Sequence, residues 1–457
     1  MLLRSGVKQG DVIAIAAEKT AETIASLLSV VRCGAAYMPV DISYPPDRLR
    51  FMLSDTNCRL LLCSPEQQEH KQTLVSSRVE VLVVKPEDLS HAEVNMEEAR
   101  RVHKARPEDP AAIIFTSGST GVPKGVEISQ GALLAQNLAM NQSRPLSSSD
   151  RIVQQTMLTF DVAGNEIWSS FFFRSTLVIV DDATRLLGFE NFLLRNAISV
   201  LFITPSHLAL LSPPACGKSL KTLVLAGEAL PPSLSDRWAS QGRALLNEYG
   251  PTETNVVTSC KDYPCSKFPS SATSIGRPLP GVVALVLDRH MRLSPVGVPG
   301  ELCIGGDQLA SSYWNRPDLT SSKFADCKLL GEGGAGQQSR RVYRTGDLCR
   351  WLPDGKIEYL GRMDNQIKIR GMRVEIGEIE SKISEEEDVS QTAVVLLQDK
   401  GVSTLAAAVV LRGKTWEEEK VVERLSASLP QHMIPSLFVC LEALPTTTSG
   451  KIDRKKL

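Results

Sequence analysis

Short apolar runs alternate with segments of helical spacing through the first half of this chain of 457 residues. Residues 11–17 have the composition of a buried strand, and residues 20–32 have that of a helix. Thr20 would be the N-cap of this helix, and Gly34 would end it at the C-terminus. The same pattern predicts further strands at 60–63, 79–84, 111–115, 151–156, 176–180, 200–203 and 222–226. Such alternation predicts a large N-terminal body of stacked, doubly wound α/β layers.

The spacing of apolar and turn-forming residues changes from Ile275 onward. Short alternating strands and turns follow, and Asp354-Gly355 is a strong hairpin signal, so we expect a small β subdomain at about 275–362. Residues 363–457 have the strand and helix pattern of a compact α+β module of ordinary domain size. We expect an ordered, turn-rich connection at 33–48, a charged linker across the surface at 89–106 and an exposed loop at 329–341.

Hydroxyl side chains and glycines follow the predicted strand 111–115. The segment 115–126 is Phe-Thr-Ser-Gly-Ser-Thr-Gly-Val-Pro-Lys-Gly-Val. Glycines allow backbone N–H groups to turn toward an anion, hydroxyls add donors, and Lys124 adds a point charge, although the spacing is not that of a Walker A loop. On composition alone two interpretations stay open, a cradle for a polyphosphate and a flexible surface loop.

Polar residues also follow two later predicted strands. Gly227-Glu228 comes directly after the strand at 222–226, and Tyr249 precedes a Gly-Pro turn that leads to Thr252 and Glu253. The ends of strands are where α/β folds bind ligands. An aromatic ring, a hydroxyl and a carboxylate there suit a base, a phosphate and a cation, while a plain turn with solvated side chains is the alternative.

Asp161 lies among apolar residues at the start of a predicted helix. One interpretation is an N-cap for a helix that begins at Val162. The other is a buried carboxylate, which costs several kcal/mol unless a cation lies beside it. The spacing alone favours the cap.

The charge balance and the cysteine pattern exclude several classes of protein. The net charge is −1 with both signs mixed throughout, which argues against nucleic-acid and membrane-surface partners. No apolar run approaches the ~20 residues of a membrane-spanning helix, and the N-terminus lacks the core of a signal peptide. The ten cysteines include no Cys-x-x-Cys pair, and the six histidines show no paired metal-ligand spacing. We therefore expect a reduced, cytoplasmic protein.

Nine motifs are spread over nearly the whole chain. They are Cys33-Gly-Ala-Ala-Tyr-Met-Pro-Val-Asp, the segment 115–126, Phe160-Asp161 with Glu166, Asn247-Glu-Tyr-Gly-Pro-Thr-Glu-Thr, Gly300-Glu-Leu-Cys-Ile-Gly-Gly, Tyr343-Arg-Thr-Gly-Asp-Leu, Gly361-Arg-Met-Asp-Asn-Gln-Ile-Lys-Ile-Arg-Gly, Leu429-Pro-Gln-His-Met-Ile-Pro and Ser449-Gly-Lys-Ile-Asp-Arg. Together they resemble the adenylation domain of a nonribosomal peptide synthetase, within the superfamily of acyl-adenylate-forming, AMP-binding enzymes. One such motif is a weak signal, whereas nine in family order and at family spacing are specific.

The resemblance implies an ATP-dependent, AMP-forming ligase that works in two steps. The carboxylate of an amino acid attacks the α-phosphate of ATP to give an aminoacyl-AMP and pyrophosphate. The thiol of a carrier-protein phosphopantetheine then takes the acyl group as a thioester. The implied context is nonribosomal peptide biosynthesis, a secondary metabolism, with carrier and condensation domains of a synthetase as partners.

The resemblance also assigns the nucleotide contacts. Tyr249, Gly227 and Glu228 would contact the base, and Asp347 and Arg362 would contact the ribose. Thr252 would contact the α-phosphate, and Glu253 would bind Mg²⁺. The cradle for the β- and γ-phosphates would consist of Thr116, Ser117, Gly118, Ser119, Thr120, Gly121 and Lys124.

By the same resemblance, Lys451 would bridge the substrate carboxylate, the ribose and the α-phosphate as charge builds at phosphorus. Asp364 would be the hinge between an AMP-binding core domain, 1–362, and a mobile C-terminal domain, 363–457. Rotation there would carry Lys451 out and bring the strand near Gly371 in for thioester formation.

The resemblance gives Asp161 a partner, the α-ammonium group of the amino acid, which reverses the preference for a helix cap. The substrate side chain would lie in a mostly apolar pocket with Asn165 and Glu248 as polar points. Apolar walls favour a neutral, medium-sized, proline-like side chain, whereas Glu248 would suit a cationic or amide group. The implied pocket residues are Val162, Asn165, Phe202, Val224, Ala226, Glu248, Val256 and Val257.

Some features depart from the family pattern. The family has roughly 50 more residues before the point that matches Met1, about one strand–helix layer, so we expect an N-terminally truncated core. The segment before Tyr313 lacks the usual arginine. No carrier domain follows Leu457, so we expect the acceptor to come from another chain or from a further part of this one.

Two other functions stay open beside the amino-acid ligase. One is an aryl- or fatty-acyl-CoA ligase of the same superfamily, against which Asp161 and the Gly-Lys-Ile-Asp-Arg tail argue. The other is a non-catalytic, truncated remnant that binds nucleotide.

Overall fold

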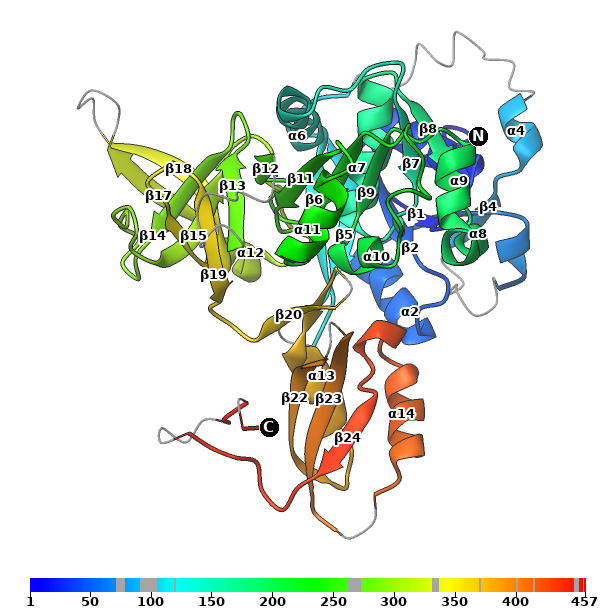
Figure 1. Ribbon diagram of the computed structural model, residues 1–457. Coiled ribbons are helices and arrows are strands. Elements are labelled where there is room, and N and C mark those ends of the chain that lie inside the picture. Colours follow the sequence, from blue (N-terminus) through cyan, green and yellow to red (C-terminus); the bar gives the residue numbers. More distant parts are fainter. Residues whose placement is uncertain are drawn as a thin grey trace.

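The computed structural model describes residues 1–70, 79–90, 105–118, 121–261, 273–330, 337–369, 371–399, 402–413, 416–447, 452–454 and 456–457. Within these ranges the chain forms two large sheets, a short hairpin and a small C-terminal sheet (Figure 1). No helix in these ranges is long and apolar enough to cross a membrane.

The first sheet contains β1 (Val12–Ala16), β2 (Ala36–Val40), β3 (Leu60–Cys63), β4 (Glu80–Val83), β5 (Pro110–Thr116), β6 (Lys124–Ser129) and β16 (Ser312–Tyr313). β1 to β5 pair in parallel, whereas β6 pairs antiparallel with β5 and β16. The neighbouring helices are α1 (Ala21–Arg32), α2 (Pro46–Asp55), η1 (Glu66–His70), α4 (Pro86–Ser90) and α6 (Gln130–Ser143). Thr20 caps α1 as predicted, because its hydroxyl accepts a hydrogen bond from the Thr23 N–H.

Two predictions in this region are wrong. The predicted connection 33–48 contains β2, a strand buried between β1 and β5, so burial overrides the turn signals of the local sequence. The glycine-rich loop predicted within the segment 115–126 is shorter than that segment, because β5 extends to Thr116 and β6, which pairs with β5, begins at Lys124. Of the predicted linker 89–106, residues 91–104 lie outside the described ranges.

The second sheet contains β7 (Arg151–Gln154), β8 (Thr176–Ile179), β9 (Val200–Ile203), β10 (Thr222–Leu225), β11 (Ala244–Tyr249), β12 (Thr258–Lys261), β13 (Ser274–Pro278), β14 (Val283–Leu287), β15 (Gly300–Gly305), β17 (Phe324–Leu330), β18 (Gln337–Trp351) and β19 (Ile357–Arg362). The order β8-β7-β9-β10-β11 is parallel, and the remaining pairs are antiparallel. Its helices are α7 (Asp161–Phe172), α8 (Asp182–Leu187), α9 (Phe189–Arg195), α10 (Pro205–Ala209), α11 (Pro232–Ala239) and α12 (Pro317–Lys323).

The central strands of the parallel part, β9 and β10, are buried on both faces, which explains why they are continuous apolar runs. Its register sets up two neighbouring rows of side chains, Leu201, Leu223 and Leu245 in one and Phe202, Val224 and Leu246 in the other. The first row packs in a core with α9 and α11, and the second in a core with α6 and α7. The predicted doubly wound α/β body is thereby confirmed.

The antiparallel part of the second sheet covers the predicted β subdomain. The turn at Asp354-Gly355 joins β18 to β19 as predicted, and Gly355 has the positive φ of 76° that such turns use. The predicted loop 329–341 is wrong at 329–330 and at 337–341, because β17 extends to Leu330 and pairs with β18, which begins at Gln337. Cross-strand pairing decides there, since the local composition has little strand propensity.

The C-terminal part contains β20 (Gln366–Ile369), β21 (Met372–Glu375), α13 (Ile376–Ser384), β22 (Val389–Asp399), β23 (Val402–Leu411), α14 (Glu418–Ser426), η4 (Gln431–Met433) and β24 (Leu437–Cys440). β20 and β21 form a hairpin, and β22, β23 and β24 form a separate sheet. α13 and α14 pack on that sheet around Ile379, Val409 and Leu425. Figure 1 shows this part below the two large sheets, with the hairpin at the junction.

Candidate active site

Glu253 lies at the centre of the predicted nucleotide residues. It follows β11, and its carboxylate is fully buried. Nη1 of Arg373, on β21, donates to both carboxylate oxygens at 2.9 and 3.0 Å, and the Tyr313 hydroxyl donates at 2.5 Å. Burial alone would raise the pKa of Glu253, but the charges of Arg373 and Lys124 hold that pKa well below its usual range. The carboxylate is therefore ionised and neutralised from two distant parts of the chain.

Lys124 points to the same carboxylate from the start of β6. Its Nζ lies 3.3 Å from Glu253 Oε1 and 4.4 Å from the centre of the Tyr313 ring. Burial is the main cause that lowers the pKa of Lys124 to about 8, and repulsion from the Arg373 charge is the second cause. The lysine predicted for the phosphate cradle thus lies beside the predicted metal ligand.

The glycine-rich loop directs donors at the C-terminal part of the chain. Ser117 Oγ donates to the backbone oxygen of Arg373 at 3.0 Å, and the Gly118 N–H donates to Glu378 at 3.2 Å. Thr116 Oγ1 is buried without a hydrogen-bond partner among the described residues. Gly121, with a φ of 81°, lies beside α13. Two predicted cradle residues lie outside the described ranges, namely Ser119 and Thr120.

Tyr249, Asp347 and Arg362 form one hydrogen-bonded chain. The Tyr249 hydroxyl donates to Asp347 Oδ2, and Arg362 donates to Asp347 Oδ1 at 2.9 Å. Arg362 also binds the predicted hinge residue Asp364, through Nε at 2.8 Å and Nη2 at 2.5 Å. Burial and the Asp347 charge raise the pKa of Tyr249 well above its usual value, so its hydroxyl stays protonated.

Gly227 and Glu228 form the turn after β10. The Glu228 carboxylate accepts hydrogen bonds from the Ser206 N–H at 2.9 Å and hydroxyl at 3.1 Å. Gly371, between β20 and β21, lies against this turn, and a Cβ at Gly227 would lie 3.1 Å from Gly371 Cα. Gly371 has a φ of 80°, and a Cβ there would lie 2.8 Å from Cγ2 of Thr204. Only glycine fits both positions without a shift.

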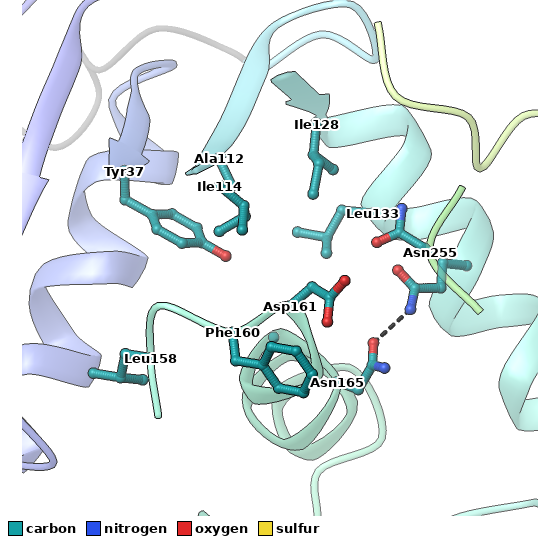
Figure 2. Close-up of a pocket in the computed structure, with 12 residues that line it drawn as sticks. Tyr37, Ala112, Ile114, Ile128, Leu133, Leu158, Phe160, Asp161, Asn165 and Asn255 are labelled. Carbon is teal, nitrogen blue, oxygen red and sulfur yellow. Dashed lines mark hydrogen bonds between the residues drawn. The ribbon is translucent and has the colours of Figure 1, made fainter. Parts of the chain in front are cut away.

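Asp161 borders a cavity whose other walls come from β2, β5, β6, α6 and α7 (Figure 2). Figure 2 shows its carboxylate directed into that space. The Thr252 hydroxyl donates to Asp161 Oδ2 at 2.6 Å. Burial raises the pKa of Asp161, and the bond from Thr252 and the charge of Lys368 offset part of this rise. α7 begins at Asp161 itself and its N-cap is Phe160, so Asp161 is a first-turn residue of the helix.

The predicted side-chain pocket is assembled only in part. Asn165 accepts a hydrogen bond from Gln136 of α6 at 2.5 Å. Ala226 is half-buried after β10, and Val257 packs in the core between the two large sheets. The predicted residues that share one apolar cluster are Val162, Phe202, Val224 and Val256.

Glu248 needs a correction, because it is not a free polar point. Arg144, which follows α6, binds it with Nε 3.1 Å from Glu248 Oε1. The Arg144 guanidinium also lies 4.6 Å from the centre of the Phe202 ring. Burial raises the pKa of Glu248, and Arg144 offsets part of that rise. An internal cation thus already pairs with the carboxylate that was predicted to meet a cationic substrate group.

Lys451 lies outside the described ranges, but residues on both sides of it are described. Thr446 forms a β-bridge with Ile452, and Ile452 packs on the sheet of β22 and β23. Arg454 donates to Glu380 of α13 at 2.6 Å. These neighbours pack on the C-terminal sheet or bind α13, and Figure 1 shows the C-terminal end well away from the two large sheets.

Sequence reasoning missed several side chains that contact the predicted residues. The strand-like segment 361–380 was unusually rich in charge, which was a usable signal for Arg373 and Lys368. Arg144 lies in no motif, and only its position at the end of α6 brings it to Glu248.

Two family models match the chain. The model described as AMP-binding enzyme matches residues 1–314, and the model described as AMP-binding enzyme C-terminal domain matches residues 378–451. These matches confirm the superfamily predicted from the nine motifs.

Relatives and a solved structure agree with this match. Tyrocidine synthase 1 of Brevibacillus parabrevis is 33% identical over 461 residues, which cover 100% of this chain and 41% of that protein. Gramicidin S synthase 1 of Brevibacillus brevis is 34% identical over 465 residues, which cover 100% of this chain and 40% of that protein. A solved four-domain nonribosomal peptide synthetase bound to AMP and glycine has a TM-score of 0.67 at 29% identity, over 99% of this chain and 33% of that chain.

The chain spans less than half of the length of each of these relatives. The matched residues nevertheless include both large sheets up to β16 and the centre of the site, Glu253. The chain therefore belongs to the AMP-binding enzyme family.

Proposed function

We propose that this chain is an amino-acid-adenylating ligase of a nonribosomal peptide synthetase. The position of Asp161 carries the proposal. Its carboxylate borders a cavity and is bonded to Thr252, the neighbour of Glu253 in the chain. An α-ammonium group bound at Asp161 would direct the substrate carboxylate toward Thr252, where the α-phosphate is expected. The similarity to two peptide synthases supports the same function.

The reaction balances in two steps. A carboxylate oxygen forms a bond to the α-phosphorus of ATP, the bond to the bridging oxygen breaks, and pyrophosphate leaves. The thiolate of a carrier-protein phosphopantetheine then attacks the acyl carbon, a thioester forms, and AMP leaves. Thr252 and Lys451 would donate hydrogen bonds where charge develops at phosphorus.

The nucleotide would replace hydrogen bonds that the protein now makes to itself. Asp347 would exchange its bond from Tyr249 for ribose hydroxyls and keep Arg362 beside it. The unpartnered hydroxyl of Thr116 and the N–H of Gly118 suit phosphate oxygens.

A magnesium ion fits this site once the hairpin has moved. One carboxylate together with substrate phosphates is a donor set that Mg²⁺ uses, and Glu253 supplies the carboxylate. Arg373 now holds both oxygens, so the metal and the docked hairpin exclude each other at Glu253. When bound, the ion would offset the repulsion between the incoming carboxylate and the phosphates.

The docked hairpin corresponds to the arrangement for thioester formation. Gly371 lies between Gly227 and Thr204 at the site, while the described neighbours of Lys451 lie on the C-terminal sheet. Adenylation would therefore need a rotation at Asp364 between a core domain, 1–362, and a C-terminal domain, 363–457. The acceptor and the condensation partner would be other domains of a synthetase.

Amino-acid-dependent exchange of labelled pyrophosphate into ATP, screened over a substrate panel, tests the proposal. We expect exchange with at least one α-amino acid. Exchange only with fatty or aryl acids would identify an acyl-CoA ligase instead. Absence of exchange by folded protein that still binds ATP would identify a nucleotide-binding remnant.

A further inference from the structure

A buried ion pair lies at the predicted pocket for the substrate side chain. Arg144 is 5% exposed, Glu248 4% and Phe202 1%. The guanidinium contacts Phe202 on β9 and Glu248 on β11, and β10 lies between those two strands. Arg144 therefore lies across β10, which contains the pocket residue Val224 and is followed by Ala226.

The charges at this end of the pocket already cancel. A single buried Arg–Glu pair is tolerated because each charge neutralises the other, whereas an additional unpaired charge is strongly unfavourable in a buried site. A lysine or ornithine side chain would meet the Arg144 charge beside an already paired Glu248. An acidic side chain would meet the charge of Glu248. The pair thus favours a substrate side chain without net charge.

One donor of the pair is unused. Arg144 Nη2 is buried and has no hydrogen-bond partner within the described part of the chain. A buried donor without an acceptor destabilises the state that contains it, and an acceptor on a bound ligand would remove that penalty. Nε donates to Glu248, and the face of the guanidinium packs on the Phe202 ring, so Nη2 is the donor that the described residues leave unpaired.

We infer that Arg144 determines substrate specificity: it excludes cationic side chains and selects an amino acid whose uncharged side chain carries an oxygen acceptor. This inference rests on the proposed function and deepens it, since it assigns a substrate class to the same site. Arg144 lies outside the eight pocket residues that the resemblance implied, and it acts on two of them, Phe202 and Glu248.

The test compares pyrophosphate exchange with glutamine, leucine, lysine and glutamate as substrates. In the natural chain we expect kcat/KM for glutamine to exceed that for lysine by at least tenfold. Arg144→Met frees Glu248, so the lysine-to-glutamine ratio should rise at least tenfold. The double variant Arg144→Met with Glu248→Gln should lose this gain and reduce the preference for glutamine over leucine.

The double variant also guards against misfolding, because replacing both members of a buried pair by neutral groups is often tolerated. Arg350→Met is a matched control, since it removes the Arg350–Glu358 pair between β18 and β19 and should leave the substrate ratios unchanged. An unchanged lysine-to-glutamine ratio in Arg144→Met, or lysine as the preferred substrate of the natural chain, would overturn this inference alone. Exchange with no amino acid at all would overturn the proposed function and this inference with it.

Discussion

Replacing Gly371 by alanine tests whether the docked hairpin is the arrangement that transfers the acyl group. Gly371 has a φ of 80°, and an added Cβ would lie 2.8 Å from Cγ2 of Thr204. The next nearest atoms to that Cβ, Phe160 Cζ and Thr204 Cβ, both lie at 3.9 Å, so the overpacking is confined to the Thr204 methyl group. Alanine should therefore weaken docking while the rest of the chain stays folded.

The magnitude follows from two terms. A left-handed conformation costs a non-glycine residue about 1–2 kcal/mol, and overpacking costs about 1–3 kcal/mol. Their sum is about 2–5 kcal/mol, and at about 1.4 kcal/mol per factor of ten this is a loss of docked population by about 30- to 3000-fold. Adenylation needs the hairpin elsewhere, so pyrophosphate exchange should stay within about twofold of the natural chain.

Thr204→Ser provides the internal check. It removes the Cγ2 methyl and keeps the hydroxyl that accepts the His207 N–H at the start of α10. In the double variant with Gly371→Ala, it should recover the overpacking term, about tenfold or more in rate. Gly413→Ala is the matched control, because a Cβ there meets nothing within 4 Å.

The assay is single-turnover transfer of a labelled amino acid to a phosphopantetheine-loaded carrier protein, with pyrophosphate exchange measured in parallel. The reasoning is refuted if Gly371→Ala transfers at the natural rate. It is also refuted if transfer and exchange fall together, because that result would locate the hairpin in both steps.

Four further outcomes are expected. Lys451→Ala should lower pyrophosphate exchange by about 10²- to 10³-fold while ATP still binds in equilibrium dialysis, and near-normal exchange would remove Lys451 from adenylation. Asp161→Asn should raise the KM for the amino acid at least tenfold and leave that for ATP unchanged; equal effects on both would argue against an ammonium contact. Arg373→Ala leaves Glu253 with Lys124 as its cation and removes a hydrogen-bonded ion pair worth about 1.5–3 kcal/mol from the docked hairpin. The rate of acyl transfer should therefore fall by about 10- to 100-fold, while pyrophosphate exchange changes little. A selective loss of exchange would contradict this expectation. Burial raises the pKa of Glu166 from 4.5 to about 8, so the natural chain loses stability as pH rises from 4.5 toward 8. Glu166→Gln should therefore gain about 3 kcal/mol on the natural chain between pH 4.5 and pH 7 in denaturant unfolding, and a difference that does not grow with pH would contradict the assignment.

Local signals were enough to predict much of the fold. The run at 60–63 is a strand with the bounds predicted, because four consecutive apolar residues bounded by polar ones suit only a strand buried on both faces. The N-cap of α1 was also predictable from local sequence, since the Thr20 hydroxyl accepts a hydrogen bond from an N–H only three residues later. Several motifs lie at the ends of buried strands, so covalent neighbours such as Thr252 and Glu253 arrive at the site together.

Tertiary contacts decided what lies opposite those residues. Buried neighbours made β2 a strand despite its turn signals, and pairing with β17 extended β18 into a segment rich in Gln and Ser. Arg373 is 120 positions from Glu253 in the chain, and Arg144 is 104 positions from Glu248.

Periodicity shows which face of an element a residue occupies, but it carries no information about which distant element covers that face. The sequence by itself therefore determined the family and the layers, and it placed Thr252 and Glu253 next to each other after β11. Only the folded chain decided which cations neutralise Glu253 and Glu248, because an ion pair forms only where packing brings two side chains within a few ångströms.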